Sequence, residues 1–146
     1  MINLFKELFD RGFISASTRG VEEYLSKDNI TTYVGFDPTA SSLHVGSLLP
    51  IMGLVRFQNV GHTPIAVVGG GTGMIGDPSG KTQERKLLSK EEIEANVEGI
   101  KKQLARFLDF DKKQNPAKLV NNSEWLTKIS MMEFLRDVGK HFSVNE

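Results

Sequence analysis

Apolar residues recur at helical spacing over residues 2–9, and Gly12 follows them as a natural stop. The pattern predicts a short amphipathic helix, and a second helix is expected over residues 21–26. Residues 31–36 are β-branched and aromatic and precede the turn pair Asp37-Pro38, which predicts a strand. The chain is therefore expected to open with a helical segment that leads into a sheet.

Residues 45–60 place apolar side chains around nearly the whole circumference of a helix, which indicates a buried helix. Because proline is tolerated only near the first turn, Pro50 requires the regular helix to begin close to residue 46 or 47. Residues 63–68 form a continuous apolar run that ends in glycines, which is typical of a strand buried on both faces of a parallel sheet. Strand, helix and strand together predict a right-handed βαβ unit.

Two later helices are expected to begin at capping boxes. Ser89 with Glu92 precedes an amphipathic helix that should reach about residue 108, and Ser130 with Glu133 precedes one that should reach about residue 138. The connector between them contains a candidate short strand over residues 118–120. These elements predict an α/β fold with a doubly wound parallel sheet, which binds ligands at the carboxyl ends of its strands.

Composition narrows the class of protein. Lys plus Arg and Asp plus Glu number 18 each, so the net charge is zero and no overall field would attract nucleic acid or an acidic membrane. The absence of cysteine excludes disulfides and a thiol nucleophile and fits a reducing compartment. Charged residues interrupt the N-terminal apolar ones, so neither a signal peptide nor a membrane span is expected. A length of 146 residues predicts one compact domain. Together with the composition and the N-terminal sequence, it leads us to expect a soluble, cytoplasmic chain.

The first loop that carries chemical groups follows the first strand. It contains Asp37 and Thr39 and leads through His44, Gly46 and Ser47 into the buried helix. A helix start offers free N–H groups and the positive end of a dipole to a phosphate. The spacing of His44 and Ser47 lets both face one ligand. The alternative is a capped helix whose histidine and hydroxyls satisfy only its own backbone, and this stretch alone favours neither.

The second such loop, residues 69–81, is rich in glycine. It spells GxGxxG over residues 71–76, but the DPSG that follows should stop the helix that a dinucleotide-binding fingerprint requires. Residues 80–82 resemble the end of a P-loop, yet Ile75 stands where that motif needs glycine. What remains is a glycine-rich backbone with the carboxylate of Asp77 and nearby basic groups, or simply a surface loop with solvated charges.

The two loops together resemble a known family. FDPTASSLHVGS is similar to the HIGH motif region of class I aminoacyl-tRNA synthetases. The stretches GHTPIAVVGGGTGMIGDPSGKTQER and FLRDVGKHFSVN resemble bacterial-type tyrosyl-tRNA synthetases, and the likeness covers almost the whole chain. Tryptophanyl-tRNA synthetases share the helix-start motif but not Tyr33 or the GMIGDPSG stretch in this form. The resemblance implies a Rossmann-like (HUP-type) fold, with residues 1–146 forming the N-terminal portion of the catalytic domain.

In that family the tyrosine carboxylate attacks the α-phosphate of ATP, pyrophosphate leaves, and the tRNA 3′ end then takes the tyrosyl group. The resemblance implies L-tyrosine, ATP with Mg²⁺ and tRNA(Tyr) as partners, a homodimer, and no membrane. Mg²⁺ is expected to be held largely by phosphates, so no protein ligand is assigned to it. No protein nucleophile is needed, and catalysis would rest on positioning and charge stabilisation.

The same resemblance assigns roles to individual residues. Tyr33 would contact the hydroxyl of bound tyrosine, and Asp77 would contact its ammonium. Lys81 and Arg85 would meet the pyrophosphate, with His44 and Thr39 acting beside them on the phosphates. The nucleotide is expected to lie against Gly35, Asp37, Thr39, His44, Gly46 and Ser47. Ser47 stands where many members have a second histidine, which departs from the HIGH pattern but keeps a hydrogen-bonding group.

The 146 residues lack the family's KMSKS-type loop, part of the tyrosine pocket and the C-terminal tRNA-binding region. The chain is expected to be inactive alone, because a doubly wound sheet builds its ligand crevice from strands of both halves. Two other functions stay open. One is an enzyme of the tryptophanyl type, and the other is an inactive module that binds a nucleotide or a partner.

Overall fold

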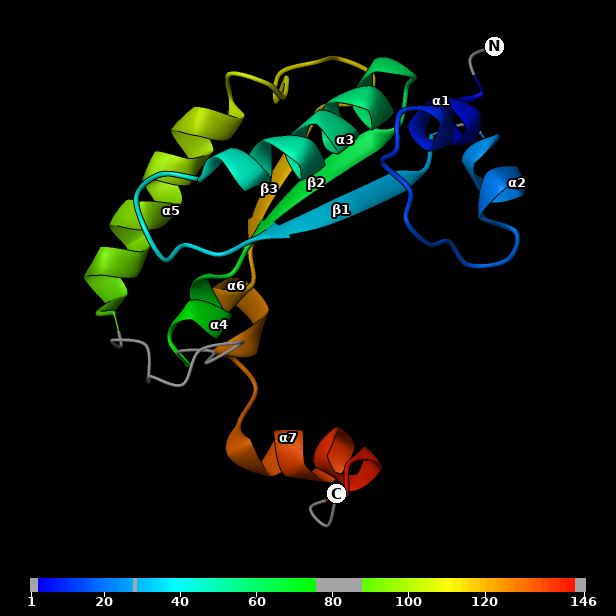
Figure 1. Cartoon of the computed structure of the whole chain (residues 1–146). Coiled ribbons are helices and arrows are strands. Elements are labelled where there is room, and N and C mark those ends of the chain that lie inside the picture. Colours follow the sequence, from blue (N-terminus) through cyan, green and yellow to red (C-terminus); the bar gives the residue numbers. More distant parts are fainter. Residues whose placement is uncertain (1–2, 28, 76–87, 144–146) are drawn as a thin grey trace.

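A three-stranded parallel sheet forms the centre of the molecule (Figure 1). The computed structural model describes residues 3–27, 29–75 and 88–143. The strands lie side by side in the order β1 (Thr31–Phe36), β2 (Thr63–Val68) and β3 (Lys118–Asn121). In sequence, α3 (Leu48–Asn59) separates β1 from β2, and α5 (Lys90–Leu104) separates β2 from β3. The predicted parallel α/β architecture is confirmed, and no reversal of strand order occurs among the described strands.

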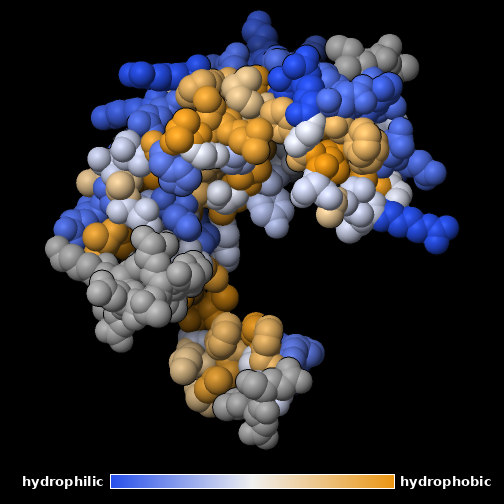
Figure 2. All heavy atoms as spheres, in the orientation of Figure 1, coloured by the Kyte–Doolittle hydropathy of each residue, from blue (hydrophilic) through white to orange (hydrophobic). Residues whose placement is uncertain are grey.

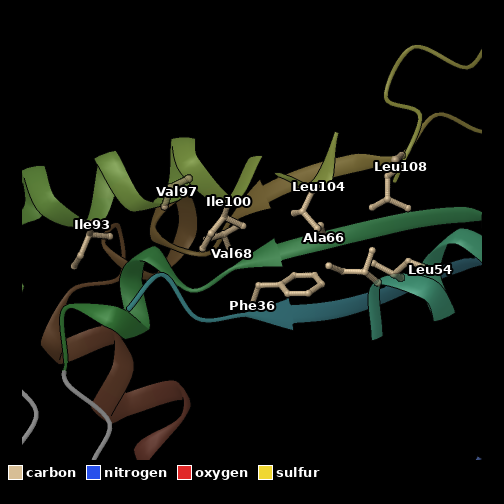
Figure 3. Packing of buried hydrophobic residues seen from close by; sticks show 11 residues of the cluster. Phe36, Leu54, Ala66, Val68, Ile93, Val97, Ile100, Leu104 and Leu108 are labelled. Carbon is tan, nitrogen blue, oxygen red and sulfur yellow. The ribbon is translucent and has the colours of Figure 1, made fainter. Parts of the chain in front are cut away.

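The hydrophobic core lies on one face of this sheet, between the strands and both helices (Figure 3). Side chains alternate along a strand, so the observed register points Phe36 of β1 and Ala66 and Val68 of β2 to the same face. Leu54 of α3 packs against them. The apolar stripe of α5 completes the core with Ile93, Val97, Ile100 and Leu104.

Neither α3 nor α5 covers the opposite face of the sheet, because both pack on the core face. Ile65 and Val67 of β2 are therefore only half-buried, and the prediction that residues 63–68 are buried on both faces is wrong. Leu48 and Leu49 of α3 are exposed, so that helix is not buried around its whole circumference as predicted. The uncovered face of the sheet is available to a ligand or to further polypeptide.

Several predicted boundaries are confirmed by local geometry. The helices α1 (Leu4–Asp10) and α2 (Val21–Leu25) form near the N-terminus. A 3₁₀ turn, Val45–Ser47, precedes α3, so the α-helix begins at Leu48 and Pro50 falls in its first turn, where proline is tolerated. The strand β3 forms where a short one was expected.

Both capping boxes are formed. Ser89 with Glu92 opens α5, and Ser130 with Glu133 opens α7 (Met131–Asp137). The helix α5 ends at Leu104 and not near residue 108, and residues 105–107 form turns. Leu108 nevertheless reaches the core, which explains why the apolar periodicity continues beyond the helix.

Three short elements were not predicted. They are α4 (Gly70–Gly73), α6 (Ser123–Leu126) and a 3₁₀ turn at Gly139–His141. The helices α6 and α7 extend away from the carboxyl end of β3, and hydrophobic atoms gather on this protruding part (Figure 2). In the described ranges no helix has the length and apolar character needed to span a membrane.

Candidate functional site

A hollow of about 520 Å³ opens at the carboxyl end of β1. The loop from β1 to α3 forms its wall, with Ser42, Leu43 and Pro50 contributing to the lining. The structure brings together here all six residues expected to lie against a nucleotide: Gly35, Asp37, Thr39, His44, Gly46 and Ser47. The hollow is broad and open to solvent, because Asp37, Thr39 and His44 are all exposed.

A larger hollow, of about 950 Å³, lies at the opposite ends of the strands. Its lining includes Asn29 ahead of β1 and His62 ahead of β2, and none of the predicted site residues that the structure describes. Parallel α/β sheets bind their ligands beyond the carboxyl ends of the strands. The smaller hollow is therefore the candidate site, although it is not the largest.

His44 is held by its own loop. Its Nδ1 atom accepts a hydrogen bond from the backbone N–H of Gly46 at 3.0 Å, and its carbonyl accepts one from Ser47 at 2.9 Å. In the neutral ring the proton must then be on Nε2, which makes Nε2 a hydrogen-bond donor. Among the described residues no hydrogen bond to Nε2 is found. The histidine thus caps the turn with Nδ1, while Nε2 has no partner in the described part of the chain. The ring can therefore cap its own loop and also donate to a ligand, which combines the two alternatives left open by the sequence.

Glycine is found at positions 46 and 35 for different structural reasons. A Cβ atom on Gly46 would lie 2.8 Å from Cε1 of His44, so a side chain there would displace the imidazole ring. A Cβ atom on Gly35 would meet nothing within 4 Å. Glycine at position 35 therefore leaves open space on the uncovered face of the sheet and is not required by packing in the described chain.

The carboxyl ends of β1 and β2 are joined next to the hollow. The N–H of Gly69 donates to the carbonyl of Phe36 at 2.9 Å. A Cβ atom on Gly69 would lie 3.4 Å from Oδ1 of Asp37, so the Asp37 carboxylate lies beside the start of the glycine-rich segment. This juxtaposition of the two predicted loops is the arrangement expected of parallel neighbouring strands.

The glycine-rich segment forms α4, whose N–H groups bind the protein itself. Oδ1 of Asn122 accepts hydrogen bonds from Gly71 at 2.7 Å and Thr72 at 3.4 Å, and Nδ2 of Asn122 donates to the Thr72 hydroxyl at 3.1 Å. A Cβ atom on Gly70 would lie 2.3 Å from Oδ1 of Asn121. These glycines permit close packing of α4 on the end of β3. Because the N–H groups of Gly71 and Thr72 are bound to Asn122, the structure disfavours the interpretation of GxGxxG as a dinucleotide-binding motif.

Of the remaining predicted residues the structure describes only Tyr33, which does not line the hollow. Tyr33 lies two positions before Gly35 on the same face of β1, with 73% of its surface exposed. Asp77, Lys81 and Arg85 lie outside the described residues. Sequence reasoning missed Asn122, whose signal is weak because asparagine is common in turns.

A family model described as tRNA synthetases class I (W and Y) matches residues 25–146. The tyrosine--tRNA ligase of Roseiflexus castenholzii is 59% identical over 145 residues, which are 99% of this chain and 34% of that protein. That of Staphylococcus carnosus is 55% identical over 144 residues, with 97% of this chain and 34% of that protein covered.

Among solved structures, a C-terminally truncated mitochondrial tyrosyl-tRNA synthetase of Coccidioides posadasii superposes with a TM-score of 0.78 at 26% identity. The alignment covers 99% of this chain and 42% of that one. The chain thus spans about a third of the length of the curated relatives. With a family model matched over most of its residues and the fold shared, the chain belongs to the class I tRNA synthetases of the W and Y family.

Proposed function

We propose that the whole protein is a tyrosine--tRNA ligase, which activates L-tyrosine with ATP and transfers it to tRNA(Tyr) in the cytoplasm. Residues 1–146 would be the N-terminal portion of its catalytic domain. The observation that carries the proposal is the hollow at the end of β1, lined by all six residues assigned to the nucleotide. The names of relatives at 55–59% identity support tyrosine over tryptophan as the amino acid.

In the proposed first step a tyrosine carboxylate oxygen bonds to the α-phosphorus of ATP. The bond from that phosphorus to the bridging oxygen breaks, and pyrophosphate leaves with the electron pair. Negative charge grows on the α-phosphate oxygens, and the Nε2–H of His44 and the Thr39 hydroxyl would donate hydrogen bonds to them. Lys81 and Arg85 would neutralise the departing pyrophosphate. The Nδ1 bond to Gly46 supports this role, because it orients the ring before the substrate arrives.

Tyrosine would lie on the uncovered face of β1. Because Tyr33 and Gly35 share that face, a ligand with its phenol at Tyr33 can extend toward the hollow at Gly35. The phenol of Tyr33 would exchange a hydrogen bond with the substrate hydroxyl. Asp77 would bind the ammonium as an ion pair, and replacing it with Asn should weaken tyrosine binding in an equilibrium titration.

Mg²⁺ bound with ATP would reduce the charge of its phosphates. The described part of the hollow offers oxygen donors suited to this ion: the Asp37 carboxylate and the hydroxyls of Thr39 and Ser47. The described residues contain no group of three or more His, Asp or Glu side chains that could hold a metal ion. These donors fit an ion carried mainly by the phosphates.

A second copy of the chain would cover the protruding apolar segment, which we define as residues 125–142. Its exposed large hydrophobic residues are Trp125, Leu126, Ile129, Met131, Met132, Phe134, Leu135, Val138 and Phe142. Such an exposed apolar patch is typical of a protein interface. Sedimentation equilibrium of the whole protein should give the mass of a dimer. The double variant Met132→Glu with Phe134→Glu should give the mass of a monomer. A monomeric parent would contradict this part of the proposal.

The test of the enzymatic function joins residues 1–146 to the remaining two-thirds of the Roseiflexus castenholzii protein. Tyrosine-dependent exchange of pyrophosphate into ATP should appear in this chimaera and not in the 146-residue chain. Tryptophan in place of tyrosine should give only background exchange. Exchange that depends on tryptophan, or no exchange with either amino acid from a folded chimaera, would contradict the proposal.

A further inference from the structure

Helix α5 contacts the loop at residues 37–44 along a stripe that is separate from its core-facing stripe. The core side chains of α5 recur at helical spacing from Ile93 to Leu104. Asn96, Gly99 and Gln103 each lie one position before a core residue and share a second stripe with the spacing i, i+3 and i+7. All three are half-buried. We propose that these three residues are positioning residues, which hold the loop carrying Thr39 and His44 in place for catalysis. This inference rests on the proposed function.

Two of the contacts are hydrogen bonds to loop backbone. Nδ2 of Asn96 donates to the carbonyl of Pro38 at 3.0 Å, directly before Thr39. Oε1 of Gln103 accepts from the N–H of Leu43 at 2.8 Å, directly before His44. Each bond thus fixes the backbone next to a residue expected to act on the phosphates. They join positions 58 and 60 residues apart, so they are tertiary contacts and not part of local turn formation.

The third contact is a close approach of two backbones. A Cβ atom on Gly99 would lie 2.2 Å from the carbonyl oxygen of Ser41 and 3.1 Å from its carbonyl carbon. Glycine is among the poorest helix formers, yet it stands inside this 15-residue helix. Its position is explained by the loop, which rests directly on the helix. Any larger residue must push the loop or the helix away.

The expected consequence is specific to the phosphate chemistry. Holding Thr39 and His44 in place should raise the rate of adenylate formation, since a displacement of about 1 Å can cost about 10²-fold in rate. Tyrosine is expected to bind on the uncovered face of β1, whereas α5 packs on the core face of the sheet, so tyrosine affinity should change little. The helix would act only through the loop, without touching a substrate.

The test uses matched variants in the chimaera described above. Gly99→Ala should slow single-turnover adenylate formation about 10- to 100-fold, with the tyrosine dissociation constant within about threefold of the parent. Gly53→Ala is the control, because it makes the same change inside α3, where the added Cβ meets only Phe13 at 4.0 Å. Gln103→Met should also slow the step, whereas Gln103→Glu keeps an acceptor for Leu43 and should restore most of the rate.

A second measurement separates this proposal from the proposed function. In the unliganded 146-residue chain, amide hydrogen exchange at Leu43 should be at least about tenfold faster in Gln103→Met than in Gln103→Glu or the parent. If the parent chimaera forms no adenylate, the proposed function fails, and this exchange still decides whether α5 holds the loop. Equal exchange in all three proteins, or adenylate formation at the Gly53→Ala rate in both Gly99→Ala and Gln103→Met, would overturn the positioning role.

Discussion

The Nδ1 atom of His44 accepts the backbone N–H of Gly46 at 3.0 Å, and a Cβ on Gly46 would collide with the same imidazole ring. The ring and the glycine are therefore two parts of one arrangement. The hydrogen bond selects the tautomer with the proton on Nε2, and the missing side chain leaves room for the ring. Together they hold in one orientation a ring that lines the hollow.

Replacing His44 with Asn should separate its two roles. Asparagine is a strong N-cap residue, so its side-chain oxygen can accept the Gly46 N–H, but its shorter amide keeps the Nδ2 donor closer to the backbone and cannot place an N–H where Nε2 of histidine lies. We expect adenylate formation in the chimaera to fall about 10²- to 10³-fold, as when one preorganised donor is lost. Tyrosine affinity and the thermal midpoint should remain near those of the parent. Stopped-flow kinetics would reject this role if the rate is unchanged.

Replacing Gly35 with Val should block the site without harming the fold. A Cβ at position 35 meets nothing within 4 Å, and valine favours strands by up to about 1 kcal/mol over glycine. The urea midpoint of the 146-residue chain should therefore equal or exceed that of the parent. Tyrosine-dependent exchange of pyrophosphate into ATP should be lost in the chimaera. Thr31→Val is the control, since Thr31 is on the same face of β1 but outside the hollow. Full activity in Gly35→Val would show that no ligand lies over β1.

The sequence was sufficient for elements whose signals are local. The capping boxes at Ser89 and Ser130 were identified from residues three apart, and the position of Pro50 limited where α3 begins. Six of the residues lining the hollow were named from the resemblance to the family, and all six lie within residues 35–47, between the end of β1 and the start of α3. Local hydrogen bonding and steric limits act between near neighbours, so they can be read along the chain.

Features that depend on tertiary partners could not be read in this way. Apolar residues in 63–68 and in α3 fit burial on all sides, but which side is covered depends on what packs there. The glycines of α4 looked like a ligand loop, and only the position of Asn122 reveals that they serve packing. Sequence reasoning also overlooked Gly99. A glycine inside a capped amphipathic helix usually has a packing reason, and here that reason is the close approach of the loop.

Removing the Asn122 side chain should loosen α4. Asn122→Ala leaves the N–H groups of Gly71 and Thr72 without their acceptor. Because water can reach the exposed Thr72 N–H, the loss should be that of an ordinary hydrogen bond, about 0.5–1.5 kcal/mol. Amide exchange at these two residues should accelerate, and the urea midpoint of the 146-residue chain should fall. Asn122→Asp keeps an acceptor oxygen and should recover most of the loss. Equal effects of the two variants would mean that the hydrogen bonds to Asn122 do not stabilise α4.

Acid should weaken the start of α7. The backbone N–H of Ser130, followed by its hydroxyl, donates hydrogen bonds to the Glu133 carboxylate and holds the pKa of Glu133 below its ordinary value of 4.5. Because the folded-state pKa is the lower one, the contribution to stability is complete above the unfolded value and is lost as pH falls through the folded value. The carboxyl group is solvent-exposed, so the effect should be confined to α7.

An NMR titration of the Glu133 side-chain carboxyl carbon measures this pKa directly. Its midpoint should lie below 4.5, and Ser130→Ala should raise it because the hydroxyl donor is removed. Glu133→Gln keeps a side-chain oxygen for the Ser130 N–H without a titrating group. Amide exchange at the start of α7 should therefore lose its dependence on acid in that variant, after correction for intrinsic exchange. A Glu133 midpoint at or above the ordinary value, unmoved by Ser130→Ala, would show that the capping box does not persist in solution.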